Sequence, residues 1–152
     1  MKVLMIGAGN MGATYAEGMS KSKLLINHKL QIYDKNVAVL DRLREKGIFD
    51  IYTDLESCLP KADIVFIAVK PYHKEALFEE MQPMINENQM FVSLMAGVTL
   101  QTIIDGLMKK KVIRAMPNLP AQRGLSMTAS RTSKEVTRLD VLVVRNVLDM
   151  TG

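Results

Sequence analysis

Six residues near the N-terminus have the spacing of a phosphate-binding turn. They read Gly7-Ala8-Gly9-Asn10-Met11-Gly12 and match the pattern G-x-G-x-x-G. The first glycine permits a tight turn, the second lets the backbone approach a pyrophosphate, and the third lets a helix pack close to a strand. Amide groups at the start of that helix then face the phosphates. The pattern is weak alone, because a glycine-rich turn without a ligand can carry the same letters.

A carboxylate follows at the spacing that a dinucleotide site requires. Asp34 lies 22 residues after Gly12, close to the spacing of about 20 at which an acidic residue contacts the ribose. Such a carboxylate accepts hydrogen bonds from the ribose hydroxyls and repels a 2′-phosphate, so Asp34 favours NAD over NADP. The neighbouring Lys35 and Asn36 could contact a 2′-phosphate and weaken this preference. In the alternative interpretation, Asp34 only precedes the second helix.

Three further groups of candidate residues follow apolar runs that predict strands. Ligands of an open α/β sheet bind beyond the carboxyl ends of its strands. The candidates there are Ala68, Val69, Lys70 and Pro71, then Ala96 and Gly97, and finally Met116, Pro117 and Asn118. Pro71 biases Lys70 towards an extended conformation and makes a rigid shelf, and the Asn118 amide both donates and accepts hydrogen bonds. Each group alone could be a plain turn, but together they predict a ligand site.

The apolar runs predict the elements that hold these residues. Strands are predicted over 3–6, 29–33, 63–69, 90–94, 112–116 and 125–129. Helices are predicted from 12 to about 23, from 36 to before 47, over 54–59 and 71–81, from 99, and from 133 to 150, with Asn36 and Ser133 as caps. Strands that alternate with helices indicate a mostly parallel sheet covered on both faces, an α/β fold of the doubly wound Rossmann type.

Composition and charge exclude several classes of function. The chain has 152 residues, 48% of them hydrophobic and 24% charged, which predicts one globular domain. The net charge of +4 is spread out apart from Lys109-Lys110-Lys111, which we interpret as a solvated helix end, so we expect no nucleic-acid partner. The apolar runs are too short for a signal peptide or a membrane span, and the single Cys58 fits a reducing compartment. We therefore expect no membrane partner and a cytoplasmic location.

No cluster of nucleophiles or metal ligands stands out in the sequence. His28 and His73 are isolated, and Cys58 has no histidine motif beside it, so we interpret it as a small buried residue. We interpret the 12 methionines as adaptable core residues. The sequence therefore predicts neither a metal site nor a catalytic triad.

Four segments together resemble pyrroline-5-carboxylate reductase, which makes proline by reducing a cyclic imine with NAD(P)H. They are IGAGNMG (6–12), VKP (69–71), LMAGVTL (94–100) and IRAMPNLPAQRG (113–124), of which the last is the most specific. The resemblance implies that the glycine loop holds the cofactor and that 68–71 line its nucleotide and nicotinamide side. It also implies that Ala96, Gly97, Met116, Pro117 and Asn118 border the nicotinamide and the imine, with Asn118 as the catalytic candidate.

The resemblance also implies a second domain that residues 1–152 do not contain. Members of the family continue into a helical domain that mediates dimerisation and supplies much of the substrate pocket. We therefore expect residues 1–152 to be the cofactor domain of a homo-oligomeric enzyme that transfers hydride from NAD(P)H to the imine, and to be inactive alone. Two other hypotheses are a dinucleotide-sensing module without turnover and another imine or hydroxyacid reductase of the same superfamily.

Overall fold

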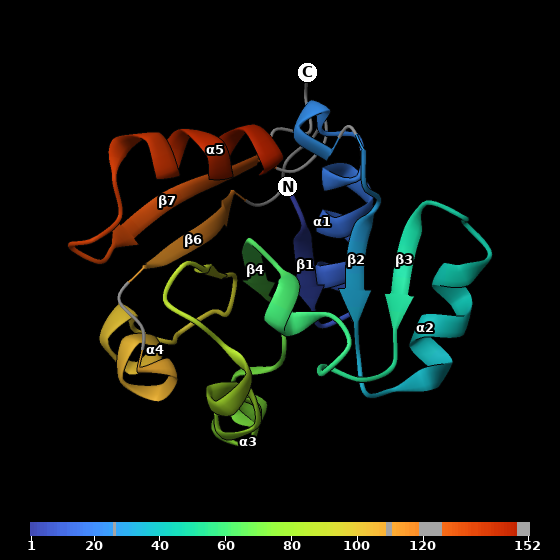
Figure 1. The fold of residues 1–152 in the computed structure, drawn as a ribbon, viewed down its shortest axis with the longest axis horizontal. Helices are drawn as coiled ribbons and strands as arrows, with labels where there is room; N and C mark the ends of the chain where they lie inside the picture. Colours follow the sequence, from blue (N-terminus) through green and yellow to red (C-terminus); the bar gives the residue numbers. More distant parts are fainter. Residues whose placement is uncertain (26, 109–110, 119–125, 149–152) are drawn as a thin grey trace.

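The computed structural model of the chain describes residues 1–25, 27–108, 111–118 and 126–148, and for 116–118 and 126–130 the backbone alone. Its seven strands form one sheet in the order β3-β2-β1-β4-β5-β6-β7 (Figure 1). Strands β1 to β6 are parallel, and β7 is antiparallel to β6. The strands are β1 (Val3–Ile6), β2 (Leu30–Tyr33), β3 (Phe49–Tyr52), β4 (Ile64–Ile67), β5 (Met90–Ser93), β6 (Val112–Asn118) and β7 (Ser126–Thr132). The order of the first six strands is that of the Rossmann fold, so the predicted fold class is confirmed.

Helices cover both faces of the sheet. The α-helices are α1 (Asn10–Met19), α2 (Val37–Arg44), α3 (Lys74–Met81), α4 (Leu100–Leu107) and α5 (Arg138–Leu148). Short 3₁₀ helices are η1 (Lys23–Leu25), η2 (Leu59–Lys61), η3 (Pro71–His73) and η4 (Gln82–Met84). One core cluster contains Ala16 of α1, Leu40 of α2 and Val147 of α5, and the other contains Phe78 of α3 and Ile103 of α4. Helices α1, α2 and α5 therefore pack on one face, and α3 and α4 on the other.

Strands β1 and β4 are apolar at every position because both of their faces are covered. In β1, Val3 and Met5 belong to the cluster with α1, and Leu4 and Ile6 to the cluster with α3. Successive side chains of a strand point to opposite faces, so a continuous apolar run is what a doubly covered strand requires. This is why the runs at 3–6 and 63–69 predicted strands without polar alternation.

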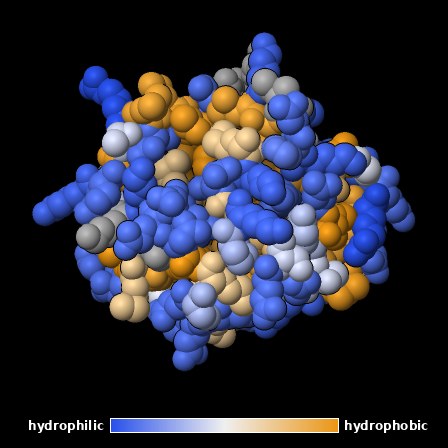
Figure 2. Space-filling model, viewed as in Figure 1, coloured by the Kyte–Doolittle hydropathy of each residue, from blue (hydrophilic) through white to orange (hydrophobic). Residues whose placement is uncertain are grey.

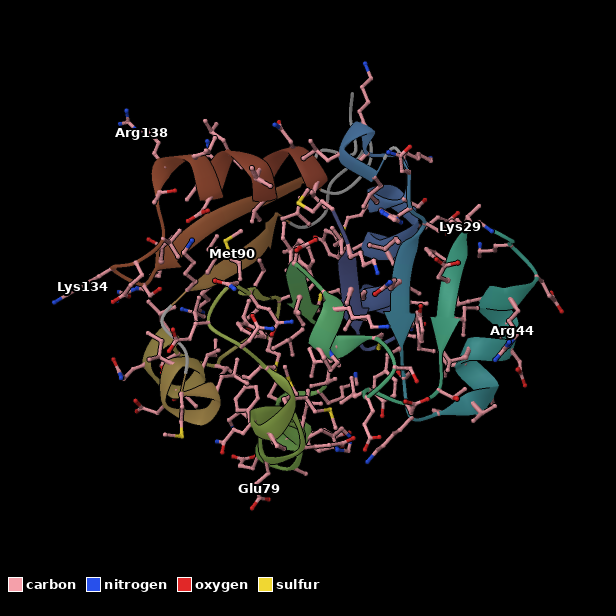
Figure 3. The ribbon with its side chains drawn as sticks, viewed as in Figure 1. Lys29, Arg44, Glu79, Met90, Lys134 and Arg138 are labelled. Atoms are coloured by element: carbon pink, nitrogen blue, oxygen red, sulfur yellow. The ribbon has the colours of Figure 1, made fainter. Side chains whose placement is uncertain are left out.

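The outer surface carries the charged side chains and a few apolar ones. Figure 3 shows Arg44, Glu79 and Arg138 projecting away from the ribbon. Figure 2 shows hydrophilic residues over most of this face, with apolar surface gathered at the top of the view, where Figure 1 draws α5. Leu139 and Leu142 of α5 are among the exposed large hydrophobic side chains. Within the described ranges, no helix is long and apolar enough to span a bilayer.

Several predicted boundaries are wrong. Strand β3 is absent from the sequence predictions, because exposed Asp50 follows buried Phe49 and the four residues form no apolar run. The predicted helix over 54–59 is instead a series of turns that leads into η2. Helix α1 ends at Met19, earlier than predicted, and η1 follows it.

The predicted cap of the last helix is also wrong. Ser133 extends the pairing with β6 instead, because its backbone N–H donates to the Val112 carbonyl at 2.9 Å and its Oγ accepts from the Val112 N–H at 3.0 Å. The cap is Thr137, whose Oγ1 accepts from the Asp140 N–H at 3.1 Å, while Asp140 Oδ2 accepts from the Thr137 N–H at 2.9 Å. This reciprocal arrangement is a capping box.

Candidate functional site

The glycine loop joins β1 to α1, and each glycine has its own steric reason. Gly7 has φ +108°, and a Cβ there would lie 2.6 Å from the Ala68 carbonyl oxygen. A Cβ on Gly12 would overlap the Gly7 carbonyl oxygen. A Cβ on Gly9 would meet nothing within 4 Å, so the space beside this residue is open. The loop therefore packs tightly at its two ends and presents free space at its middle, as a backbone that receives a phosphate requires.

Hydrogen bonds fix the loop to the two strands beside β1. The Gly7 N–H donates to the Tyr33 carbonyl at 2.8 Å, and the Ala68 N–H donates to the Ile6 carbonyl at 2.8 Å. Gly9 is the N-cap of α1 and provides no side-chain acceptor for the first-turn amides. These amides, with the partial positive charge of a helix N-terminus, can therefore receive the oxygens of an anionic ligand.

Asp34 connects the carboxyl end of β2 to the glycine loop. Its Oδ2 accepts from the Ala8 N–H at 2.8 Å, and its Oδ1 accepts from the Asn36 N–H at 2.8 Å. Each carboxylate oxygen can accept a second hydrogen bond, so capacity remains for ribose hydroxyls. The capping of α2 belongs to Asn36, whose Oδ1 accepts from the Ala38 N–H at 3.1 Å. Asp34 thus does more than precede the second helix.

The carboxyl end of β4 continues in an extended conformation and then enters a short 3₁₀ helix. Ala68 and Val69 are half-buried, and Lys70 is exposed in an extended conformation with φ −63° and ψ 137°. Pro71 then begins η3, a turn closed by a 2.9 Å hydrogen bond from the His73 N–H to the Lys70 carbonyl. Because β4 pairs with β1, this segment lies next to the glycine loop.

The turn after the carboxyl end of β5 has open space beside it. Leu94 continues the pairing, since its N–H donates to the Ile67 carbonyl at 2.8 Å. Ala96 and Gly97 follow and are exposed. Gly97 has φ +73°, and a Cβ there would meet nothing within 4 Å. A planar ligand can therefore approach this turn without a side chain in its way.

The predicted end of β6 needs a correction. We predicted that the strand ends at Met116, but it continues through Pro117 to Asn118, which is opposite Ser126 of β7. Strand β5 pairs with β6 only as far as Arg114. Beyond Arg114, the described neighbour of β6 is β7 alone. Pro117 lacks a backbone N–H, and proline is tolerated in a strand that is paired on one side only.

The positions of the remaining predicted side chains are not described. The backbones of Met116, Pro117 and Asn118 are part of β6, but their side chains, with residues 119–125, lie outside the described residues. In the sheet, β2, β1, β4 and β5 are consecutive neighbours, so their carboxyl ends lie side by side along one edge. The role of Asn118 stays a prediction.

The surroundings of Cys58 keep its thiol in the protonated form. Burial, and to a smaller extent the charge of Asp54, raises the pKa of the Cys58 thiol to about 12, so the thiol stays protonated at neutral pH. Its interpretation as a buried residue is confirmed, since it is 1% exposed. No group of three or more His, Cys, Asp or Glu that could hold a metal ion occurs in the part of the chain that the structure describes.

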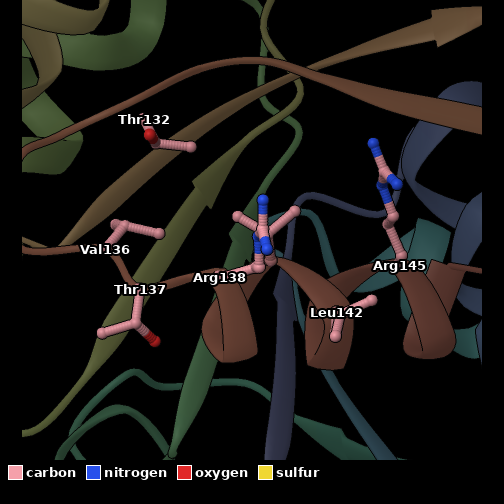
Figure 4. Close-up of a pocket in the computed structure, with 7 residues that line it drawn as sticks. Thr132, Val136, Thr137, Arg138, Leu142 and Arg145 are labelled. Atoms are coloured by element: carbon pink, nitrogen blue, oxygen red, sulfur yellow. The ribbon is translucent and has the colours of Figure 1, made fainter.

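A shallow groove lies elsewhere, between β7, the turn after it and α5. It has a volume of about 510 Å³, and Figure 4 shows Thr132, Val136 and Leu142 around it, with Arg138 and Arg145 projecting from α5. None of the predicted cofactor residues lines it. The glycine loop is the better candidate, because it combines uncapped helix amides, an open backbone and a fixed carboxylate.

Tyr72 is 74% exposed after the carboxyl end of β4 and is not among the candidates predicted from the sequence. The signal was present, because an aromatic residue directly after the proline of a strand exit stands at the ligand edge of an open sheet.

Comparisons with known proteins agree with this geometry. Residues 2–97 match the model of the family described as "NADP oxidoreductase coenzyme F420-dependent". The pyrroline-5-carboxylate reductase of Staphylococcus haemolyticus is 38% identical over 131 residues, which cover 84% of this chain and 48% of that protein. The chain spans about half the length of the curated relatives it matches.

Two solved structures of pyrroline-5-carboxylate reductases share the fold. The Coxiella burnetii structure superposes with a TM-score of 0.83 at 25% identity and covers 99% of this chain and 56% of its own. The Plasmodium falciparum structure, which has NADP bound, gives a TM-score of 0.76 at 19% identity over 100% of this chain and 55% of its own. The chain therefore belongs to the family described as NADP oxidoreductase coenzyme F420-dependent, and it is similar to the N-terminal, cofactor-binding domain of pyrroline-5-carboxylate reductases.

Proposed function

We propose that this chain is the NAD(P)H-binding part of a pyrroline-5-carboxylate reductase, which transfers hydride to a cyclic imine and makes L-proline. The observation that carries the proposal is the glycine loop. A Cβ at Gly9 would meet nothing within 4 Å, and the first-turn amides of α1 have no side-chain cap. Asp34 is fixed to the same loop through the Ala8 N–H. This combination supports a dinucleotide rather than a turn without a ligand.

Each group of candidate residues has its own task in this proposal. The amides at the start of α1 hold the pyrophosphate, and Asp34 accepts hydrogen bonds from the ribose. The extended Lys70 and Pro71 on one side, and the turn at Gly97 on the other, orient the flat nicotinamide ring. The bound nicotinamide supplies the hydride. The Asn118 amide, with Met116 and Pro117 beside it, borders the imine, which arrives protonated and needs no acid from this segment.

The preference between NAD and NADP follows from Asp34. Its carboxylate would lie next to a 2′-phosphate and repel it, so we propose that NADH binds more tightly than NADPH. The exposed Lys35 stands beside it and would reduce the difference without reversing it. NADP bound to the Plasmodium falciparum enzyme is a property of that protein.

Turnover requires more than these residues in our proposal. Since the chain spans about half the length of its curated relatives, we propose that a further domain completes the imine pocket and forms a homo-oligomer. A dinucleotide-sensing module without turnover would also bind the cofactor and lack a substrate pocket. No specific observation favours this alternative.

Two measurements test the proposal. Calorimetric titration should show that NADH and NADPH both bind, and absence of binding by either would overturn the assignment. A spectrophotometric assay of NADH oxidation with pyrroline-5-carboxylate should show no substantial turnover by the 152-residue chain. Steady turnover would contradict the need for a further domain and would leave the cofactor assignment standing.

A further inference from the structure

Two arginines lie directly opposite each other on the last two strands of the sheet. Arg114 of β6 pairs with Arg131 of β7. Val112 of β6 belongs to the core cluster on the α3 side, so Arg114, two residues later, projects to the same face. Thr132 borders the groove beside α5 on the other face, so Arg131 before it also projects to the α3 side. Both guanidinium groups therefore extend from one face of the sheet, on neighbouring strands.

The pair brings two positive charges together at the end of the sheet. Side chains directly opposite on antiparallel strands have Cβ atoms about 5 Å apart, and like charges at such positions are destabilising. The ion pairs within 4 Å among the described residues join other side chains, and none of them includes Arg131. An anion between Arg114 and Arg131 would therefore relieve a repulsion as well as add an attraction.

The neighbouring elements leave the Arg131 side of this pair open. Arg131 is exposed and Arg114 is half-buried. Helix α4 packs on β6 from the α3 side, whereas α5, which contacts β7, lies on the opposite face. A ligand can therefore reach Arg131 from solvent and meet Arg114 at the margin of the core, where salt screens an electrostatic attraction less.

We propose that Arg114 and Arg131 together bind one oxyanion of the phosphate class. Each guanidinium presents a planar fork of N–H donors, and a phosphate has enough oxygens to accept from two forks, whereas one fork fills the two oxygens of a carboxylate. A phosphate monoester carries a charge of about −1.5 to −2 at pH 7 and so balances two arginines. The site uses none of the residues proposed for the dinucleotide, so it does not depend on that proposal.

The test titrates the 152-residue chain with inorganic phosphate, phenyl phosphate, dimethyl phosphate and acetate at constant ionic strength. Proton–nitrogen correlation spectra follow the Nε–H signals of the arginines, which separates this site from phosphate bound at the glycine loop. Inorganic phosphate and phenyl phosphate should shift the Arg131 signal with dissociation constants of about 1 mM. Dimethyl phosphate and acetate carry a single negative charge and should bind at least about tenfold more weakly.

Variants of the exposed arginine test whether the pair acts together. Arg131→Gln removes one fork and should weaken phosphate binding, followed on the Arg114 signal, by at least about tenfold. The control Arg138→Gln removes an exposed arginine from α5 and should stay within about twofold. Arg131→Glu places a carboxylate opposite Arg114, so phosphate should no longer bind and should no longer raise the melting temperature at this site.

Each outcome supports the oxyanion site or overturns it. Binding of both phosphate and its ester supports a site open to esters, and binding of inorganic phosphate alone supports one for the free ion. If Arg131→Gln and Arg138→Gln weaken binding equally, the anion is attracted by the basic surface in general and the site is overturned. Acetate that binds as tightly as phosphate, or an Arg131 signal that no anion shifts, overturns it too. The titrations with NADH test the proposed function separately.

Discussion

At the scale of single residues, Asp34 combines two roles. Its carboxylate accepts the Ala8 N–H at 2.8 Å and so holds the glycine loop, and it also carries the negative charge closest in sequence to the proposed ribose site. The spacing from the glycine motif predicted the residue, but it did not predict the bond to Ala8. That bond depends on the register of β1 against β2, which pairs Ile6 with Tyr33 and sets both loops at one level.

The first prediction concerns cofactor preference. Asp34→Ser removes the charge and keeps a short hydroxyl acceptor, so the ratio of the NADPH to the NADH dissociation constant should fall by about tenfold, as expected for one lost repulsion near the surface. Titration calorimetry with both cofactors measures it. Asp50→Ser on β3 is the control, because it removes another exposed carboxylate and should leave the ratio unchanged. An unaltered ratio in the Asp34 variant would assign the preference to other residues.

The second prediction separates two glycines of the loop. Gly9 has φ −68°, which alanine adopts readily, and open space beside it. Gly9→Ala should therefore keep its melting temperature while its NADH affinity falls by at least about tenfold, because the methyl group occupies the space of the phosphate. Gly12→Ala should instead destabilise the fold by roughly 1–3 kcal/mol, since its Cβ overlaps the Gly7 carbonyl oxygen. Thermal denaturation beside calorimetry distinguishes the two, and equal loss of stability would contradict the open space at Gly9.

At the scale of elements, the sequence predicted what depends on apolar runs and missed what depends on pairing. Strand β1 is apolar throughout and was predicted within its bounds. Strand β3 contains Asp50 and exists because it pairs with β2 along an edge. Ser133 has the residue type of a cap, but its pairing with Val112 is a long-range contact that local sequence does not contain.

The third prediction tests the capping box of α5. Burial alone would raise the pKa of Asp140, but hydrogen bonds from Thr137 and the nearby Lys111 outweigh it and leave the pKa lowered. A carboxyl with a lowered pKa in the folded chain contributes stability above its unfolded pKa of about 3.9, and this is lost as pH falls through the folded value. Asp140→Asn should therefore cost roughly 1 kcal/mol at pH 7 and less near pH 3.

Urea denaturation at the two pH values measures this difference. Asp41→Asn is the control, because Asp41 pairs with Arg44 in an exposed ion pair on α2, which contributes little to stability. A loss of stability in Asp140→Asn that is equal at pH 7 and pH 3 would contradict the role of the charge.

At the scale of the whole molecule, two cores on opposite faces of one sheet must form together. Phe66 of β4 faces the cluster of α1, and Val65 beside it faces the cluster of α3. A ligand at the carboxyl ends of β1, β2 and β4 would contact strands that contribute to both cores. Binding at one edge should therefore stabilise the entire domain.

The fourth prediction follows from this coupling. NADH at about 100 times its dissociation constant should raise the free energy of unfolding by about 2.7 kcal/mol. Where alkylation of Cys58 requires unfolding, its rate should then fall by about a hundredfold. Mass spectrometry after timed exposure to iodoacetamide measures the rate, with chain unfolded in urea as the reference for an accessible thiol. If the alkylation rate is the same with and without saturating NADH, the thiol is exposed by local opening and not by unfolding of the domain.

The single cysteine makes opening of this chain directly measurable. Since the sequence contains one cysteine and the thiol is buried against the α3 side of the sheet, each molecule that opens once and is trapped gains a single mass increment. The count of such molecules in a cell extract gives the opened fraction without purification, dye or mutation. The rate of Cys58 alkylation therefore reports the opening of this chain, and a ligand that slows it can be found by mass alone.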